Sequence, residues 1–227
     1  MTSVLLVGAI VVAAICWAVL FVPERDGIWT RSWIVATVLV AYSTVALLAL
    51  DDLAEAFGPL GIAEYAIGAA VGGAWLIGTH VGHVVLCRFC PTFLDQTRDL
   101  YAIAAGDQRR AIVGPIVAMG VAEEMMFRGL LQPEGGFALG LAVYTVVQLV
   151  EKKWALVLAA LSGGTVWGLL AWWRDGLVAA IVAHVLWTSI LTFVWPLRGL
   201  RRYPDPRGGG DRRHVAPGQP VARPSCR

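Results

Sequence analysis

The sequence predicts an all-α, polytopic membrane helix bundle, with about seven transmembrane helices and one interfacial amphipathic helix. Of its 227 residues, 58% are hydrophobic and only 15% are Asp, Glu, Lys or Arg. Soluble domains have about 45–50% apolar residues and about 25% charged residues. Long uncharged runs recur, with lengths near the roughly 20 residues that cross a bilayer. The alternation of barrel strands is absent, so helices must satisfy the backbone in lipid. This composition excludes a soluble enzyme, a nucleic-acid binder and a disordered chain.

Seven runs with few or no charges account for the predicted membrane helices. In chain order they cover residues 1–23, 32–50, 65–87, 111–133, 135–150, 154–173 and 176–197. Three charges interrupt the fourth run, and the fifth is short for a crossing. The first run lacks the basic start and small-residue cleavage site of a signal peptide, so we interpret it as a helix.

Residues 91–110, between the third and fourth runs, have the pattern of an amphipathic helix. Pro91 suits its first turn and Gly106 its end. The predicted apolar face consists of Phe93, Leu94, Thr97, Leu100, Tyr101 and Ala104, and the polar face of Asp95, Gln96, Arg98 and Asp99. The segment is too polar to span the bilayer, and we expect it to lie in the interface.

The chain divides into N-terminal transmembrane helices (1–90), an interfacial helix followed by a helix bundle with the candidate site (91–197), and a tail (198–227). The tail is rich in Arg, Gly and Pro, which predicts disorder. All of the 18 Lys and Arg residues except Arg128 and Arg174 fall on one side of the predicted bundle. The positive-inside rule therefore predicts a multi-pass plasma-membrane protein with a cytoplasmic C-terminus and an external N-terminus.

The three charges of the fourth run are the first candidates for function, because each costs about 2.5–3.5 kcal/mol in a membrane helix. Glu124 and Arg128 are four residues apart and can form an ion pair on one helix face. Glu123 lies about 100° around the helix and has no partner at helical spacing. Glu123 is therefore the candidate general base.

Two further polar pairs have the same four-residue spacing. Tyr144 and Gln148 share a face in the fifth run, and His184 and Thr188 share a face in the seventh. Counted along their helices, Glu123, Gln148 and His184 sit roughly 10–17 Å from the same membrane face, so they can converge. That face bears Glu134 and Arg174 and is external by the charge rule.

The three pairs together resemble the motifs of the CPBP family, which contains CAAX prenyl endopeptidases and bacteriocin-processing or immunity proteins. Its first motif is Glu-Glu-x-x-x-Arg, here Glu123 to Arg128 followed by Gly-Leu-Leu-Gln. Its second is Phe-x-x-x-His, where Tyr144 and Gln148 stand, and its third is His-x-x-x-Asn, where His184 and Thr188 stand. The resemblance covers roughly residues 90–197.

The resemblance implies an intramembrane endopeptidase in which Glu123 activates water, supported by Glu124 and Arg128. His184 would stabilise the oxyanion, with Thr188 as a second hydrogen-bond donor. Gln148 departs from the motif, because an amide neither exchanges a proton near pH 7 nor binds a metal as imidazole does. The alternative is a catalytically impaired relative that acts as a membrane scaffold or immunity protein.

No cofactor is required by this scheme, and a divalent metal is the alternative. Gln148 weakens the hypothesis of a zinc site on Glu123, His184 and a third ligand, because catalytic zinc usually has three protein ligands. His83 and Cys87 are further candidate ligands, in a stripe with His80 and Cys90 that would suit a metal- or haem-associated protein. That stripe is about 15 Å long, so one ion cannot contact all four. The expected partners are a membrane-embedded or membrane-associated peptide or protein substrate and the lipid bilayer, with no nucleic acid.

Overall fold

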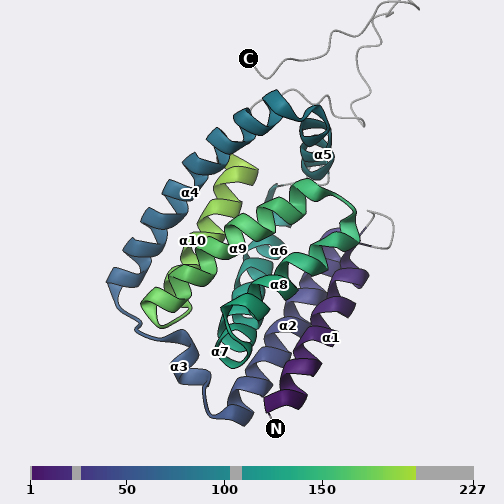
Figure 1. Ribbon diagram of the computed structural model, residues 1–227. Coiled ribbons are helices and arrows are strands. Elements are labelled where there is room, and N and C mark those ends of the chain that lie inside the picture. The colour runs from purple at the N-terminus through teal and green to yellow at the C-terminus, as the bar shows by residue number, and fades with distance from the viewer. Residues whose placement is uncertain (1, 22–26, 103–108, 198–227) are drawn as a thin grey trace, which may run out of the picture.

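The computed structural model describes residues 2–21, 27–102 and 109–197, which are helical and contain no strand (Figure 1). Each predicted run falls on helix. The elements are α1 (Thr2–Phe21), α2 (Ile28–Leu50), α3 (Leu53–Phe57), α4 (Ile62–Phe89), α5 (Pro91–Ala102), α6 (Arg109–Glu123), η1 (Glu124–Leu131), α7 (Gln132–Gly135), α8 (Phe137–Val147), η2 (Gln148–Glu151), α9 (Trp154–Arg174), α10 (Val178–Ser189) and η3 (Ile190–Val194). The predicted disordered tail and the predicted helix end at Gly106 lie outside the described residues.

Four of the described helices, α1, α2, α4 and α9, are long and apolar enough to cross a membrane. Two shorter apolar segments, 137–151 and 178–194, follow α7 and α9. The chain is therefore a multi-pass helical membrane protein, and the total of seven crossings stays a prediction. The fourth run does not form one continuous α-helix, because its polar centre adopts the π-helix η1.

The first part of the core joins α1 and α2 to η1. Ala9, Ala13 and Leu39 are fully buried in it. Trp17 of α1 packs edge-on against Phe127 of η1, with ring centroids 5.6 Å apart. This packing of the N-terminal helices against η1 holds the polar motif inside the protein rather than at the lipid surface.

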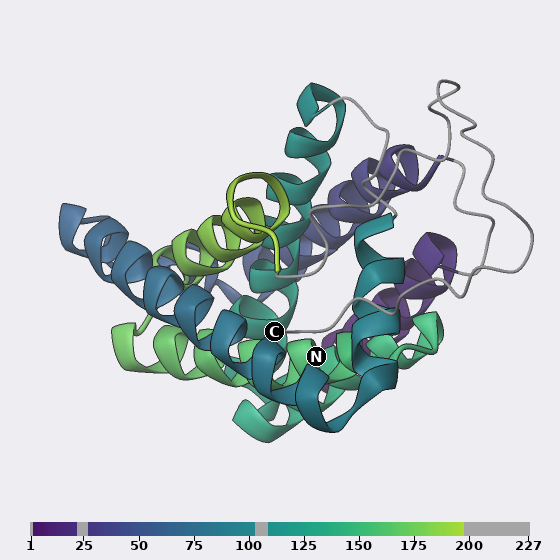
Figure 2. The same ribbon diagram turned by 90° about the horizontal axis from the view of Figure 1, so that it is seen from above.

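The second part of the core joins α4, α9 and α10. Helices α4 and α10 lie side by side in both views of the ribbon (Figures 1 and 2). They approach closely at Gly68 and Gly72, where a Cβ atom would lie 2.5 Å and 2.7 Å from the carbonyl oxygens of Ala179 and Ala183. Small residues allow such close backbone contact between membrane helices.

The predicted amphipathic segment forms α5, and residues 103–108 beyond it are not described. Phe93, Leu94 and Thr97 of the predicted apolar face are buried. Gln96, assigned to the polar face, instead accepts a hydrogen bond from the backbone N–H of Ala155 at 3.0 Å. This contact satisfies an amide in the first turn of α9, so α5 is fixed to α9 as well as to α4.

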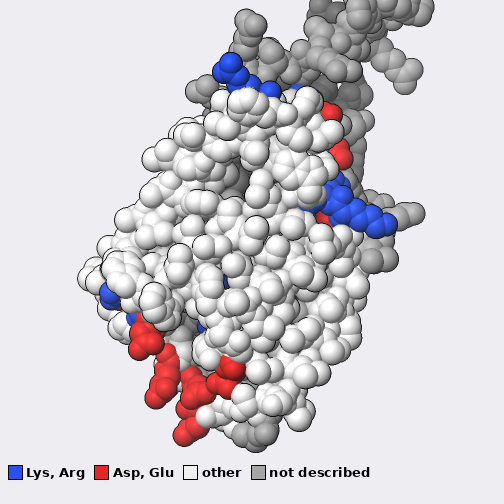
Figure 3. Space-filling model, in the orientation of Figure 1, with Lys and Arg blue, Asp and Glu red and all other residues white. Residues whose placement is uncertain are grey.

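Acidic and basic side chains gather at opposite ends of the molecule (Figure 3). Asp52, Glu55, Glu134 and Asp175 belong to the end where α3 and the α9–α10 turn lie, and they line one cavity. At the same end, Arg174 binds the buried Glu64 through Nε at 3.0 Å and Nη2 at 2.5 Å. This bidentate pair ties the start of α4 to the end of α9.

Candidate functional site

The first motif lies where α6 ends and the π-helix η1 begins. Glu123 is the last residue of α6, and Glu124 and Arg128 belong to η1, which has eight residues. All eight residues of η1 are buried. π-helical turns are rare and occur frequently at functional sites. The sequence predicted an α-helical ion pair here, and the pair forms within a wider helical turn.

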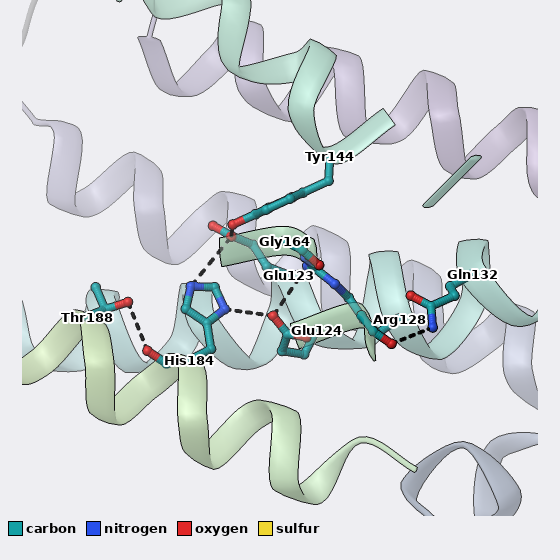
Figure 4. Close-up of polar contacts among 9 residues, drawn as sticks. Glu123, Glu124, Arg128, Gln132, Tyr144, Gly164, His184 and Thr188 are labelled. Carbon is teal, nitrogen blue, oxygen red and sulfur yellow. Dashed lines mark hydrogen bonds and ion pairs between the residues drawn. The ribbon is translucent and has the colours of Figure 1, made fainter. Parts of the chain in front are cut away.

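Glu124 is the centre of a buried polar network (Figure 4). Its Oε1 accepts a hydrogen bond from Arg128 Nη1 at 3.3 Å and lies 2.7 Å from Nδ1 of His184. Arg128 also donates from Nη2 to the carbonyl of Gly164 in α9, at 3.2 Å. No atom of the described residues is hydrogen-bonded to Oε2 of Glu124. The Glu124 side chain is 0% exposed, so this carboxylate has no access to solvent.

The imidazole of His184 is held by the rings around it. The indole of Trp167 stacks on it, with centroids 5.6 Å apart and planes 14° from parallel. Because a carboxylate paired with Arg128 accepts hydrogen bonds, we assign the proton of this contact to Nδ1 of His184. The other ring nitrogen, Nε2, then faces Glu123, with Oε2 of Glu123 at 4.0 Å.

Glu123 differs from Glu124 in both its partners and its exposure. Its Oε2 accepts a hydrogen bond from the hydroxyl of Tyr144 at 2.9 Å. Its side chain is 14% exposed, whereas the side chain of Glu124 is 0% exposed. Among the described residues, none donates a hydrogen bond to Oε1 of Glu123 (Figure 4). The arrangement therefore presents one anchored and one available carboxylate oxygen.

Two of the predicted site residues do not take the contacts that the motif pattern suggests. Gln148 is buried at the start of the 3-10 helix η2, which packs against α1 and α9, and its side chain makes no hydrogen bond within the described part of the chain. Thr188 donates its hydroxyl hydrogen to the carbonyl of His184 at 3.0 Å. The structure thus brings Glu123, Glu124, Arg128 and His184 into one network and leaves Gln148 outside it.

Two cavities reach this network from different directions. One, of about 540 Å³, is lined by Arg128 and Gln132 together with the four acidic residues of the α3 end. The other, of about 590 Å³, has an almost entirely apolar lining that includes Thr188, Ser162 and Trp187. The charged cavity is therefore lined by Arg128, which belongs to the network. The apolar cavity is lined by Thr188, which is hydrogen-bonded to the backbone of His184.

The candidate metal ligands of α4 have separate partners. Cys87 Sγ lies 3.5 Å from Nε2 of His83, and both residues are buried. His80 stacks on Trp195 and donates to its carbonyl at 3.1 Å, and Cys90 contacts Thr92. Among the described residues, no group of three or more His, Cys, Asp or Glu side chains is placed to hold a metal ion.

Three contacts of the site were not foreseen from the sequence. The hydroxyl of Tyr144, which stands where the second motif has Phe, binds Glu123 directly. The carbonyl of Gly164 and the ring of Trp167 fix Arg128 and His184. The extra oxygen of Tyr144 was the available signal, because a buried phenol usually finds a hydrogen-bond partner.

The fold and the site define a multi-pass helical membrane protein with a buried glutamate–arginine–histidine network. Residues 108–190 match the family model described as type II CAAX prenyl endopeptidase Rce1-like. This match supports the resemblance of this segment to the CPBP family. The description names a protease family. Comparisons with curated proteins and with solved structures gave no match.

Proposed function

We propose that the protein is an intramembrane endopeptidase in which Glu123 is the general base that activates water. The observation that supports this best is the contrast between the two glutamates. Glu123 is partly exposed, has one anchored oxygen and faces Nε2 of His184 at 4.0 Å. Glu124 is enclosed and paired. A general base must reach the proton that it removes, and only Glu123 meets this condition.

The remaining residues would support that step. Oε1 of Glu123 takes the proton of water, and the resulting hydroxide attacks the peptide carbonyl. The tetrahedral intermediate then collapses with cleavage of the C–N bond, and the proton held by Glu123 passes to the leaving amine. His184, held through Nδ1 by Glu124, donates from Nε2 to the developing oxyanion when both ring nitrogens carry a proton. Thr188 holds the backbone carbonyl of His184 and so acts on position rather than on the oxyanion. The apolar cavity would accept the apolar part of a membrane-associated substrate.

The test is a peptidase assay with the full chain in lipid vesicles and a membrane-embedded peptide. Replacing the base by an isosteric amide, Glu123→Gln, should abolish cleavage while the protein stays folded. The mechanism is wrong if Glu123→Gln cleaves as fast as the native chain. A metal-dependent reaction would be lost on chelation, whereas we expect the glutamate reaction to survive it.

A second candidate function is that of a non-catalytic scaffold or immunity partner, and the position of Gln148 favours it. Gln148 stands where the second motif has histidine, and its side chain is buried without a hydrogen bond to the described residues. If the native chain is inactive, Gln148→His distinguishes the two cases. It should create activity in an impaired enzyme and none in a site that serves only binding.

A further inference from the structure

We infer that Tyr144 is the positioning residue for Glu123 in this chain, through the hydrogen bond that its hydroxyl donates to Oε2. This inference rests on the proposed function. It concerns a position where the second motif has Phe, which carries no hydroxyl.

Tyr144 is held in place on several sides. It is 5% exposed, and the guanidinium carbon of Arg128 lies 4.2 Å from the centre of its ring. The ring of Phe127 packs against it with centroids 4.9 Å apart. These contacts fix the ring, so the hydroxyl meets Glu123 Oε2 at 2.9 Å without further rearrangement.

The anchoring of one oxygen has a consequence for the other. A carboxylate that could rotate freely would present either oxygen to water, in many orientations. With Oε2 held by the Tyr144 hydroxyl, the plane of the carboxylate is fixed and Oε1 remains for the reaction. Correct orientation of a base lowers the entropic cost of reaching the transition state.

The position of Gln148 explains why the contact comes from Tyr144. The α-helix α8 ends at Val147, and Gln148 starts a tighter 3-10 helix. The tighter helix changes the angle between successive side chains, so residues 144 and 148 do not project in the same direction. Gln148 belongs to η2, which packs against α1 and α9, whereas the hydroxyl of Tyr144 reaches Glu123.

The experiment compares Tyr144→Phe with Tyr42→Phe in the same peptidase assay. Tyr42 is a matched control, because its hydroxyl donates to the carbonyl of Leu5 at 2.8 Å between α1 and α2, away from the site. A hydrogen bond to a charged group corresponds to about tenfold to hundredfold in rate. We expect Tyr144→Phe to lower kcat by that factor with KM unchanged, and Tyr42→Phe to keep the native kcat.

The two hypotheses fail in different ways. If the native chain shows no cleavage that depends on Glu123, the proposed function is wrong. If the native chain cleaves and Glu123→Gln does not, the inference is overturned by a kcat of Tyr144→Phe within about threefold of native, calculated per folded protein. A rise in KM with kcat retained would also overturn it, because Tyr144 would then contact substrate rather than position Glu123.

Discussion

His184 Nδ1 lies 2.7 Å from Glu124 Oε1, the same oxygen that accepts the hydrogen bond from Arg128. The second glutamate of the motif therefore joins a cation on its own helix to an imidazole on α10. It connects the element that carries the base with the element that carries the proposed oxyanion donor. Loss of this carboxylate should affect both folding and catalysis.

Glu124→Gln should destabilise the protein strongly, because it leaves the buried charge of Arg128 without compensation. Removing one partner of a buried pair typically costs about 3–5 kcal/mol. Unfolding in detergent micelles measures the effect. Asp95→Asn is the control, since Asp95 forms an ion pair with Arg98 while its side chain is 74% exposed, and such pairs contribute about 0–1 kcal/mol. Equal losses in the two variants would contradict the central role of Glu124.

His184→Gln should keep the fold and lose most of the activity. An amide at this position can still donate to Glu124, but it cannot carry a second proton toward the oxyanion. We expect kcat to fall by about 10²–10⁴-fold, the typical contribution of a positioned acid or base. His80→Gln is the matched control. His80 belongs to α4 and contacts the carbonyl of Trp195 rather than Glu123 or Glu124. Native kcat in His184→Gln would exclude the proposed role.

Gly164→Ala should perturb the site by overpacking. A Cβ atom there would lie 2.8 Å from Cδ1 of Tyr144 and 2.9 Å from Cδ1 of Leu141. Extra carbon in a packed core costs about 1–3 kcal/mol, and displacement of Tyr144 should also reduce kcat. Gly73→Ala is the control, since no atom lies within 4 Å of its Cβ position. The prediction fails if both variants unfold at the same temperature as the native chain.

The proposed orientation can be tested with single cysteines in a chain whose own four cysteines are replaced. Glu55 of the acidic end and Asp95 of the opposite end are both exposed. A membrane-impermeant maleimide applied to intact cells should label Glu55→Cys, and it should label Asp95→Cys only after permeabilisation. The reverse pattern would place the acidic end and its cavity in the cytoplasm.

Much of the fold could be predicted from the sequence, because membrane helices are specified by local composition. The predicted runs are mostly helical over their described residues, and the burial of Phe93, Leu94 and Thr97 in α5 agrees with their spacing. The pairing of Glu124 with Arg128 was also predictable, since it depends on residues four apart. The short helix α3 and the π-helical form of η1 were not, because tertiary packing rather than local pattern produces them.

Contacts between helices explain why the remaining contacts of the site could not be predicted from the sequence. The sequence predicted that Glu123 and His184 converge, whereas Nδ1 of His184 contacts Glu124 and only Nε2 approaches Glu123. Which of two neighbouring carboxylates an imidazole meets depends on the rotation of α10 against η1. That rotation follows from close contacts such as Gly120 against Val185, which no pattern within a single helix encodes.

The π-helix η1 makes the length of the first motif as important as its composition. Each of its hydrogen bonds closes over five residues instead of four, so the segment holds one more residue than regular helix would need. Deletion of a single residue there would allow the α-helical repeat to return between α6 and α7, and side chains within η1 would lose their present neighbours. The segment should therefore tolerate conservative substitution at its apolar positions far better than it tolerates a change of one in the number of residues.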